Sequence, residues 1–266
     1  MKLRAFTLIE LLLVVAVLAT LLGILLPALG RARASAESTQ CLSNIRQLAI
    51  ANDSYASEQR DLFAPGAVAI GSTNLKRWHG SRATLGEPFT PRGGALTPYL
   101  DGNSASTGVR ACPAFAPRMD ELRARGIGFE LSCGGYGYNN AFVGVQRRQL
   151  IPGAWTVFTD QTGSLRSRFS SPARTIVFTD AALAADELIE YSFAEPCYWP
   201  DYASARPDPS IHFRHHGTAA VAWLDAHATH ETRSFTQSSG LYTADSEALG
   251  TGWFGDATSN ALYDYE

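Results

Sequence analysis

The feature of this 266-residue chain that most restricts its fold is a long apolar stretch near the N-terminus, residues 6–26. As an α-helix it would extend about 31 Å, which is enough to cross the roughly 30 Å hydrocarbon core of a bilayer. The stretch contains one acid, Glu10, although a carboxylate inside a membrane-spanning helix costs roughly 2.5–3.5 kcal/mol. The sequence therefore predicts a membrane-spanning helix whose acid has a purpose that offsets this cost.

Three interpretations of this segment compete. A secretory signal peptide would have an uncharged apolar region followed by small residues at a cleavage site. Small residues do occur at 32–36 ("ARASA"), but Glu10 is out of place in such a region. A plain membrane anchor fits the length and gives Glu10 no role. In the third interpretation Glu10 pairs with a cation held in the apolar phase, because a buried charge is tolerated when it is paired.

The stretch "RAFTLIELLLVVAVLATLLGILLP", residues 4–27, resembles the N-terminus of type IV prepilins and type II secretion pseudopilins. In that family a peptidase cuts just before the Phe of such a motif, and the new α-amino group is methylated. The resemblance implies cleavage between Ala5 and Phe6, with Ala5 standing where the family usually has Gly. It also implies that Glu10 pairs with the cationic N-terminus of a neighbouring subunit. Pro27 matches a proline that pilins carry at about this place, and a proline inside a helix tends to kink it.

Helical periodicity continues beyond the apolar stretch, and we expect one helix from Phe6 to about Glu58. Its second half has a mainly apolar stripe at i, i+3 and i+4 spacing, which predicts a face packed on a globular domain. The stripe consists of Cys41, Leu42, Ile45, Leu48, Ala49, Asn52, Tyr55 and Ala56.

The rest of the chain predicts short strands, short helices and long loops. Strand-like runs of β-branched and aromatic residues occur at 154–160, 175–180, 188–193 and 219–229. Short helical turns are expected at 94–100 and 118–126, and residues 66–98 read as an ordered loop anchored by Trp78. The predicted fold is α+β and pilin-like, with a long N-terminal helix packed on a small antiparallel sheet. The expected divisions are a leader at 1–5, a transmembrane and assembly helix at 6–27, an amphipathic helix at 28–60 and an extracytoplasmic head at 61–266.

The strongest chemical candidate is "RHHGTAAVAWLDAHATH", residues 214–230. His215 and Asp225 flank a strand, and Asp225 and His227 would share one face of it. Asp180, at the end of another strand, could join them. Such a group forms either a hydrogen-bonded structural network, which we favour, or a divalent metal site such as zinc. A second stretch, "DGNSAS" at 101–106, has some likeness to a calcium loop but lacks the closing Glu of an EF-hand.

Residues 214–230 also resemble the H-X9-DG segment of a large group of prepilin-type proteins. In that group an RHxG turn precedes a strand that ends in DGH. His215 and Asp225 stand at the His and Asp positions, and Ala226 stands where the group has Gly. Other stretches similar to that group are "CLSNIRQLA", "RACP", "YGYNN", "SPARTIVFTDAA" and "GWFG", so the resemblance covers most of the chain.

The four cysteines are widely spaced and include no CxxC pair, which argues against a zinc-finger type of site. Outside the cytoplasm they could form two disulfides in any of three pairings. Cys41 and Cys112 lie in stretches that resemble the prepilin-type group, whereas Cys133 and Cys197 lie outside its usual cysteine positions. The resemblance therefore implies the pairs Cys41–Cys112 and Cys133–Cys197.

The net charge and the motifs that the sequence lacks exclude several classes of function. The formal net charge is −3 and no basic block is present, so nucleic acid is not an expected partner. There is no Gly-rich phosphate loop or GxSxG motif, and we expect neither an enzyme nor a cofactor. The resemblance implies a structural subunit of a type II secretion or type IV pilus-type filament, inserted once in the inner (cytoplasmic) membrane with its head outside, in a surface or periplasmic filament. Its expected partners are other pilin or pseudopilin subunits, prepilin peptidase and membrane lipid. The alternative is a membrane-anchored extracytoplasmic binding protein or metalloenzyme with a His/Asp site.

Overall fold

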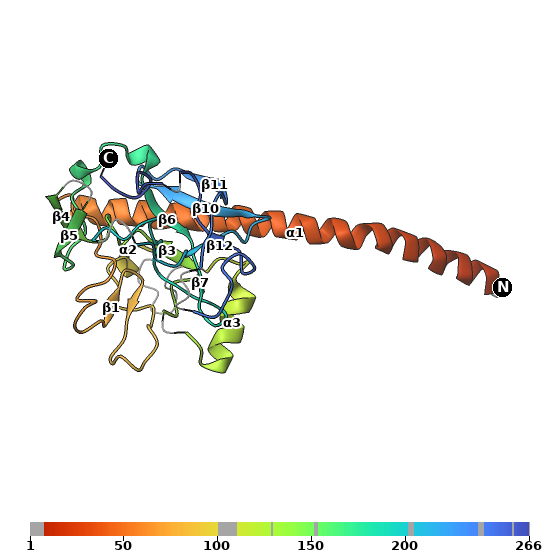
Figure 1. Cartoon of the computed structure of the whole chain (residues 1–266). Coiled ribbons are helices and arrows are strands. Elements are labelled where there is room, and N and C mark those ends of the chain that lie inside the picture. Colours follow the sequence, from red (N-terminus) through yellow and green to blue (C-terminus); the bar gives the residue numbers. More distant parts are fainter. Residues whose placement is uncertain are drawn as a thin grey trace.

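In the computed structural model of this chain, a long helix projects from a globular head (Figure 1). The structure describes residues 8–100, 111–128, 130–151, 154–201, 205–238, 242–256 and 258–265. Ala5, Phe6 and the calcium-loop candidate at 101–106 therefore lie outside the described residues. Antiparallel strands, short helices and loops make up the head, so the predicted α+β fold with a long N-terminal helix is confirmed.

Helix α1 (Leu8–Glu58) is 51 residues long and continues through Pro27. Figure 1 shows its N-terminal half projecting alone, with a gentle bend, and its C-terminal half running through the head. The two halves differ in burial, since residues 8–33 are all exposed and burial begins at Cys41. Most of the predicted stripe is buried, while its members Leu42 and Tyr55 are half-buried and Asn44 and Ala51 are buried in addition. The buried residues are Cys41, Asn44, Ile45, Leu48, Ala49, Ala51, Asn52 and Ala56.

The main sheet has four antiparallel strands in the order β11–β10–β6–β3. Their bounds are β3 Tyr136–Tyr138, β6 Ile176–Asp180, β10 Thr218–Trp223 and β11 Ala228–Thr232. Helix α1 packs on β10, β6 and β11. Strand β10 has the sequence TAAVAW, and residues 219–222 are fully buried. Small side chains on both faces of this central strand let the helix approach the sheet closely.

The remaining elements are short and lie around this core. They are β1 Lys76–Arg77, β2 Gly80–Ser81, α2 Thr97–Leu100, α3 Ala116–Arg125, β4 Gln146–Ile151, β5 Ala154–Thr159, two 3-10 turns at Arg166–Arg168 and Pro172–Arg174, β7 Leu183–Ala184, β8 Leu188–Ile189, β9 Ile211–His212 and β12 Thr251–Gly252. The strand expected at 188–193 is regular only over β8. The run at 219–229 divides into β10, a turn and the start of β11.

The long loop at 66–98 has only two short strands and α2, as predicted, and is held by Trp78. The Trp78 side chain is fully buried and packs edge-on against Phe178 of β6. Its indole Nε1 donates a hydrogen bond to the carbonyl of Ser192 at 2.8 Å. This one residue therefore fastens the loop both to the sheet and to the chain that follows β8.

A disulfide joins Cys41 of α1 to Cys112, just before α3, with the two Cα atoms 5.0 Å apart. This confirms the first predicted pair. The second predicted pair is wrong, because Cys133 and Cys197 are both free and buried. Their neighbours differ, since Cys133 lies beside Glu190 and Cys197 lies near Arg206. Burial, reinforced by Glu190, raises the pKa of the Cys133 thiol well above its usual value. Burial also raises the pKa of Cys197, to about 11.

The two bonded cysteines are 71 positions apart in sequence. The disulfide therefore closes a long loop and strongly restrains the unfolded chain. We expect replacement of Cys41 and Cys112 by Ala to lower the free energy of unfolding of the head by about 4 kcal/mol, from chain entropy. Urea unfolding of the full chain in detergent micelles, followed by tryptophan fluorescence, measures this. Replacement of Cys133 and Cys197 by Ala is the control, and an equal loss in both variants would contradict the assignment.

Candidate functional sites on the exposed helix and in the head

The exposed half of α1 is the most distinctive surface of the molecule. Within the described residues, α1 is the one helix long and apolar enough to cross a membrane. Its exposed large apolar side chains include Leu8, Ile9, Leu18, Ile24 and Leu26. An apolar surface of this extent is stable only when lipid or another protein covers it. Glu10 lies in the first described turn of α1 and is exposed on this surface.

The four His and Asp residues predicted to form one group are divided into two pairs. His215 precedes β10 and Asp225 follows it, so the length of the strand separates them. His215 lies beside Asp180, at the end of the neighbouring strand β6, whereas Asp225 bonds to His227. The expected convergence of all four residues is therefore wrong. The four residues do not converge because the six-residue strand β10 holds His215 and Asp225 apart.

The Asp180–His215 pair is buried in the head. The side chains of Asp180 and His215 are 0% and 2% exposed, and Asp180 Oδ2 lies 3.1 Å from His215 Nε2. Asp180 Oδ2 also accepts a hydrogen bond from the Ala220 backbone N–H at 2.7 Å. His215 Nε2 in turn lies 3.6 Å from Cys112 Sγ of the disulfide. The pair thus connects two central strands to the covalent link on α1.

The turn before β10 fixes the position of His215. Reciprocal backbone hydrogen bonds join His215 and Thr218, and both residues between them have positive φ, 54° at His216 and 84° at Gly217. That combination is typical of the type I′ turn, which matches the twist of antiparallel strands. The "RHHG" sequence therefore closes a tight hairpin that turns the His215 imidazole into the core.

The Asp225–His227 pair lies on the surface at the other end of β10. Asp225 Oδ1 lies 2.5 Å from His227 Nδ1 and accepts a hydrogen bond from the His227 backbone N–H. The His227 ring stacks on Trp223 at an interplanar angle of 9°. Partial burial acts to raise the pKa of Asp225, but the hydrogen bonds from His227 outweigh it and lower that pKa below its usual value. This pair orders the turn between β10 and β11.

Ala226, in the middle of that turn, has a φ of +67°. The left-handed region is unfavourable for Ala because its Cβ crowds the backbone, and Gly has no such penalty. The resemblance placed a glycine at this position, and the backbone adopts the conformation that a glycine would favour. The turn therefore forms with Ala under local strain.

A buried ion pair that sequence reasoning did not find joins Arg77 to Glu130. Both side chains are at most 3% exposed, and Arg77 Nη2 lies 2.6 Å from Glu130 Oε1. Glu130 also accepts a hydrogen bond from Ser192 Oγ, while the Arg77 guanidinium stacks over the Phe89 and Phe193 rings. The partners are 53 positions apart in sequence, so no local sequence pattern could have paired them.

Two adjoining pockets of about 270 and 360 Å³ form a cleft beside this ion pair. They share Ile70, Tyr191, Phe193, Glu195 and Trp199. Burial raises the pKa of Glu195 to about 7, although its hydrogen bond from Tyr191 Oη, at 2.6 Å, acts in the opposite direction. Trp199 remains 40% exposed. A partly protonated acid and an accessible aromatic ring suit the binding of a small polar molecule.

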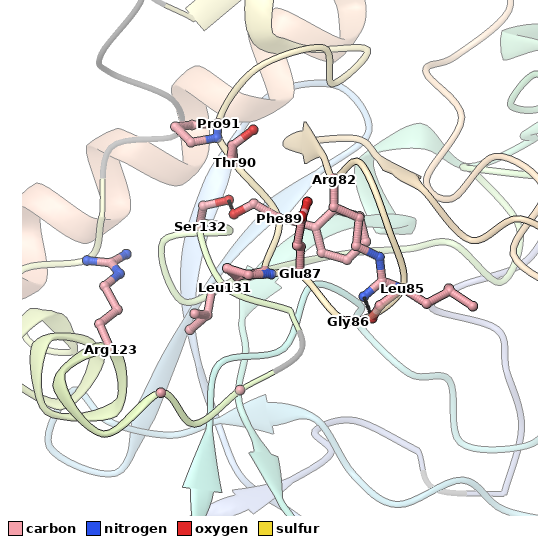
Figure 2. A pocket seen from close by; sticks show the side chains of 13 residues that line it. Arg82, Leu85, Gly86, Glu87, Phe89, Thr90, Pro91, Arg123, Leu131 and Ser132 are labelled. Atoms are coloured by element: carbon pink, nitrogen blue, oxygen red, sulfur yellow. Dashed lines mark hydrogen bonds between the residues drawn. The ribbon is translucent and has the colours of Figure 1, made fainter.

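A separate pocket of about 630 Å³ opens between the loop at 82–91 and the end of α3 (Figure 2). Figure 2 shows Arg82 beside Phe89, with Arg123 on the opposite side. Ser132 donates a hydrogen bond to the Phe89 carbonyl and lies 3.4 Å from His79 Nδ1. Burial, with the charge of Arg77, lowers the pKa of His79 to about 3, so this imidazole is too weak a base to activate a serine efficiently. The pocket is large enough for a small ligand, and the weakly basic His79 does not favour Ser132 as a nucleophile.

Comparisons with family models, with curated proteins and with solved structures find no match to this chain.

The Asp180–His215 pair should matter to stability, and the Asp225–His227 pair should not. Asp180→Ala leaves the buried Ala220 N–H without its acceptor, and we expect it to lower the free energy of unfolding of the oxidised chain by about 2–3 kcal/mol. Asp225→Ala removes an exposed contact and should cost less than about 1 kcal/mol. Thermal melts and urea titrations compare the two variants, and an equal or reversed effect would contradict this assignment.

The strain at Ala226 predicts that a substitution will stabilise the protein. Ala226→Gly relieves the left-handed backbone, a gain that exceeds the added entropy of the unfolded chain, so stability should rise by about 0.5–1 kcal/mol. Gly217→Ala is the matched control, because its φ is +84° and an added Cβ would meet no atom within 4 Å. That variant should lose about 1 kcal/mol. A destabilised Ala226→Gly variant in denaturant titration would show that strain is not the controlling factor.

Proposed function

We propose that this chain is a structural subunit of a type II secretion or type IV pilus-type filament, and that prepilin peptidase processes it before Phe6. The prepilin-like motif at residues 4–27 suggests this function, and one structural observation supports it most directly. Helix α1 has an entirely exposed apolar half and a second half built into the head. In the proposed filament, lipid covers the exposed half before assembly and neighbouring helices cover it afterwards.

Glu10 has a specific role in this proposal. The carboxylate is unfavourable in lipid by roughly 2.5–3.5 kcal/mol, and pairing with the cationic N-terminus of a neighbouring subunit offsets that cost. A correctly staggered neighbour removes the penalty, whereas a shifted one does not. The acid therefore favours one register between subunits at the expense of the isolated subunit.

The orientation in the membrane follows from charge and cysteine chemistry. Lys2 and Arg4 precede the apolar stretch, and positive residues beside a membrane-spanning helix favour the cytoplasmic side. The head contains the Cys41–Cys112 disulfide, a bond that persists in oxidising compartments. Both observations support a head outside the cytoplasmic membrane.

The proposal is tested by crosslinking in the native membrane. We expect Glu10→Gln to leave the chain in the membrane fraction but to remove the ladder of crosslinked subunits, since the neighbouring cation loses its carboxylate. Glu37→Gln, on the same helix, is the control and should leave the ladder intact. Mass spectrometry of the same samples should find an N-methylated Phe6 as the first residue.

Two results would count against the filament proposal. A mature chain that begins within residues 32–36 would indicate a secretory signal peptide. A ladder that is equally strong in the Glu10→Gln variant would remove the pairing between subunits.

A second candidate function is a membrane-tethered binding protein, and the cleft around Glu195 and Trp199 favours it. Such a head would act alone and would not depend on Glu10. Once a ligand of the cleft is identified, normal ligand binding and normal function of the Glu10→Gln variant would favour the binding protein over the filament subunit.

A further inference from the structure

Three side chains that carry metal-ligating atoms meet where α1 crosses the sheet, and a fourth, Asp180, lies beside the histidine of this group. Cys41 comes from α1, Cys112 from the segment before α3, His215 from the turn before β10 and Asp180 from the end of β6. Cys41 Sγ, Cys112 Sγ and a ring nitrogen of His215 all lie within 4.8 Å of one another. The ring nitrogen Nε2 is 3.6 Å from Cys112 Sγ and 3.1 Å from Asp180 Oδ2.

These separations suit a tetrahedral zinc ion. With Zn–S near 2.3 Å and Zn–N and Zn–O near 2.1 Å, tetrahedral ligand atoms lie about 3.6 Å apart for S and N and about 3.4 Å apart for N and O. The His215 distances are therefore already close to those of a coordination shell. The two sulfur atoms are bonded to each other in the structure, so they must separate before they can bind a metal.

The environment of Asp180 provides a second indication of a ligand. Its side chain is fully buried, and its atom Oδ1 has no hydrogen-bond partner among the described residues. A buried carboxylate oxygen without a hydrogen-bond partner is unfavourable, and a metal ion bound to the same carboxylate offsets part of that cost. The oxygen that faces His215 is Oδ2, and its second lone pair can keep the hydrogen bond from Ala220 when it binds the metal.

An exposed histidine, His230, lies next to the cluster. The His230 ring lies edge-on to the His215 ring, with centroids 5.8 Å apart, and its Nε2 is 3.2 Å from Ser38 Oγ on α1. His230 itself is exposed. The four residues are at most 4% exposed, so a metal ion reaches them only when neighbouring side chains such as His230 move.

We propose that Cys41, Cys112, His215 and Asp180 bind one Zn²⁺ ion when the disulfide is reduced. A dithiol reductant supplies two electrons and two protons, which convert the disulfide to two thiols while the reductant becomes a disulfide. Zinc then binds both sulfurs as thiolates and releases their two protons. In the oxidised chain a covalent bond ties α1 to the head, and in the reduced chain the metal ties them.

The test uses the full chain in detergent micelles, stripped of metal and either oxidised or reduced with a phosphine. After incubation with Zn²⁺ and desalting, elemental analysis should find about one zinc per reduced chain and none per oxidised chain. Replacement of Cys41 and Cys112 by Ala should abolish binding, whereas replacement of Cys133 and Cys197 by Ala should not. With Co²⁺ in place of Zn²⁺, the reduced chain should show a thiolate-to-cobalt charge-transfer band.

His215→Ala and Asp180→Asn examine the other two ligands. His215→Ala should weaken zinc binding at least about tenfold, and His227→Ala, a surface histidine of the same hairpin, should leave it unchanged. Zinc should also raise the melting temperature of the reduced wild-type chain but not of the variant without Cys41 and Cys112. The proposal is overturned if the reduced chain unfolds regardless of zinc, if it binds no zinc, or if binding depends on Cys133 and Cys197 instead.

Discussion

The packing of α1 on strand β10 is the contact on which the rest of the head depends. The helix contributes Ile45, Leu48 and Ala49, and the strand contributes a row of fully buried small residues. Burial of this surface stabilises the head by roughly 25 cal/mol per Å² of apolar area, far more than any single polar contact. The same helix continues outward as an exposed apolar rod, so its two halves have different surroundings. The head buries one half, and the other half is apolar, exposed and long enough to cross a membrane.

Buried polar side chains in the head form hydrogen bonds with backbone groups that helices and strands would satisfy in other proteins. Asn139, in the "YGYNN" stretch, is fully buried, and its amide donates to the carbonyls of Ile176 and Tyr263 while its oxygen accepts from the Phe142 N–H. Asn52 of α1 accepts a hydrogen bond from the Ala64 N–H in the same way. Loops can be buried when such residues satisfy their backbone groups. The head therefore holds long stretches of chain outside helices and strands without exposing them.

The sequence predicted those parts of the structure that depend on local periodicity. The end of α1 at Glu58, strands β5 and β6, and the end of α3 at Gly126 follow from side-chain spacing and from the left-handed preference of glycine. The resemblance to prepilin-type proteins implied the Cys41–Cys112 bond. The sites were harder to predict, because pairs such as Arg77–Glu130 and Asp180–His215 come from distant segments that only the fold brings together. The Cys133–Cys197 pair was wrong for the same reason, since being the two remaining cysteines says nothing about distance.

The place of the disulfide on α1 has a mechanical consequence. Cys41 is the first buried residue along the helix, so it lies where the projecting rod enters the head. A pull along the rod reaches this bond before it reaches the apolar contacts further along. Tension would pass through the bond into the chain leading to α3, and the helix would be spared from peeling off the sheet one turn at a time. The head is thus attached to its shaft, where the shaft enters it, by a covalent bond as well as by packing.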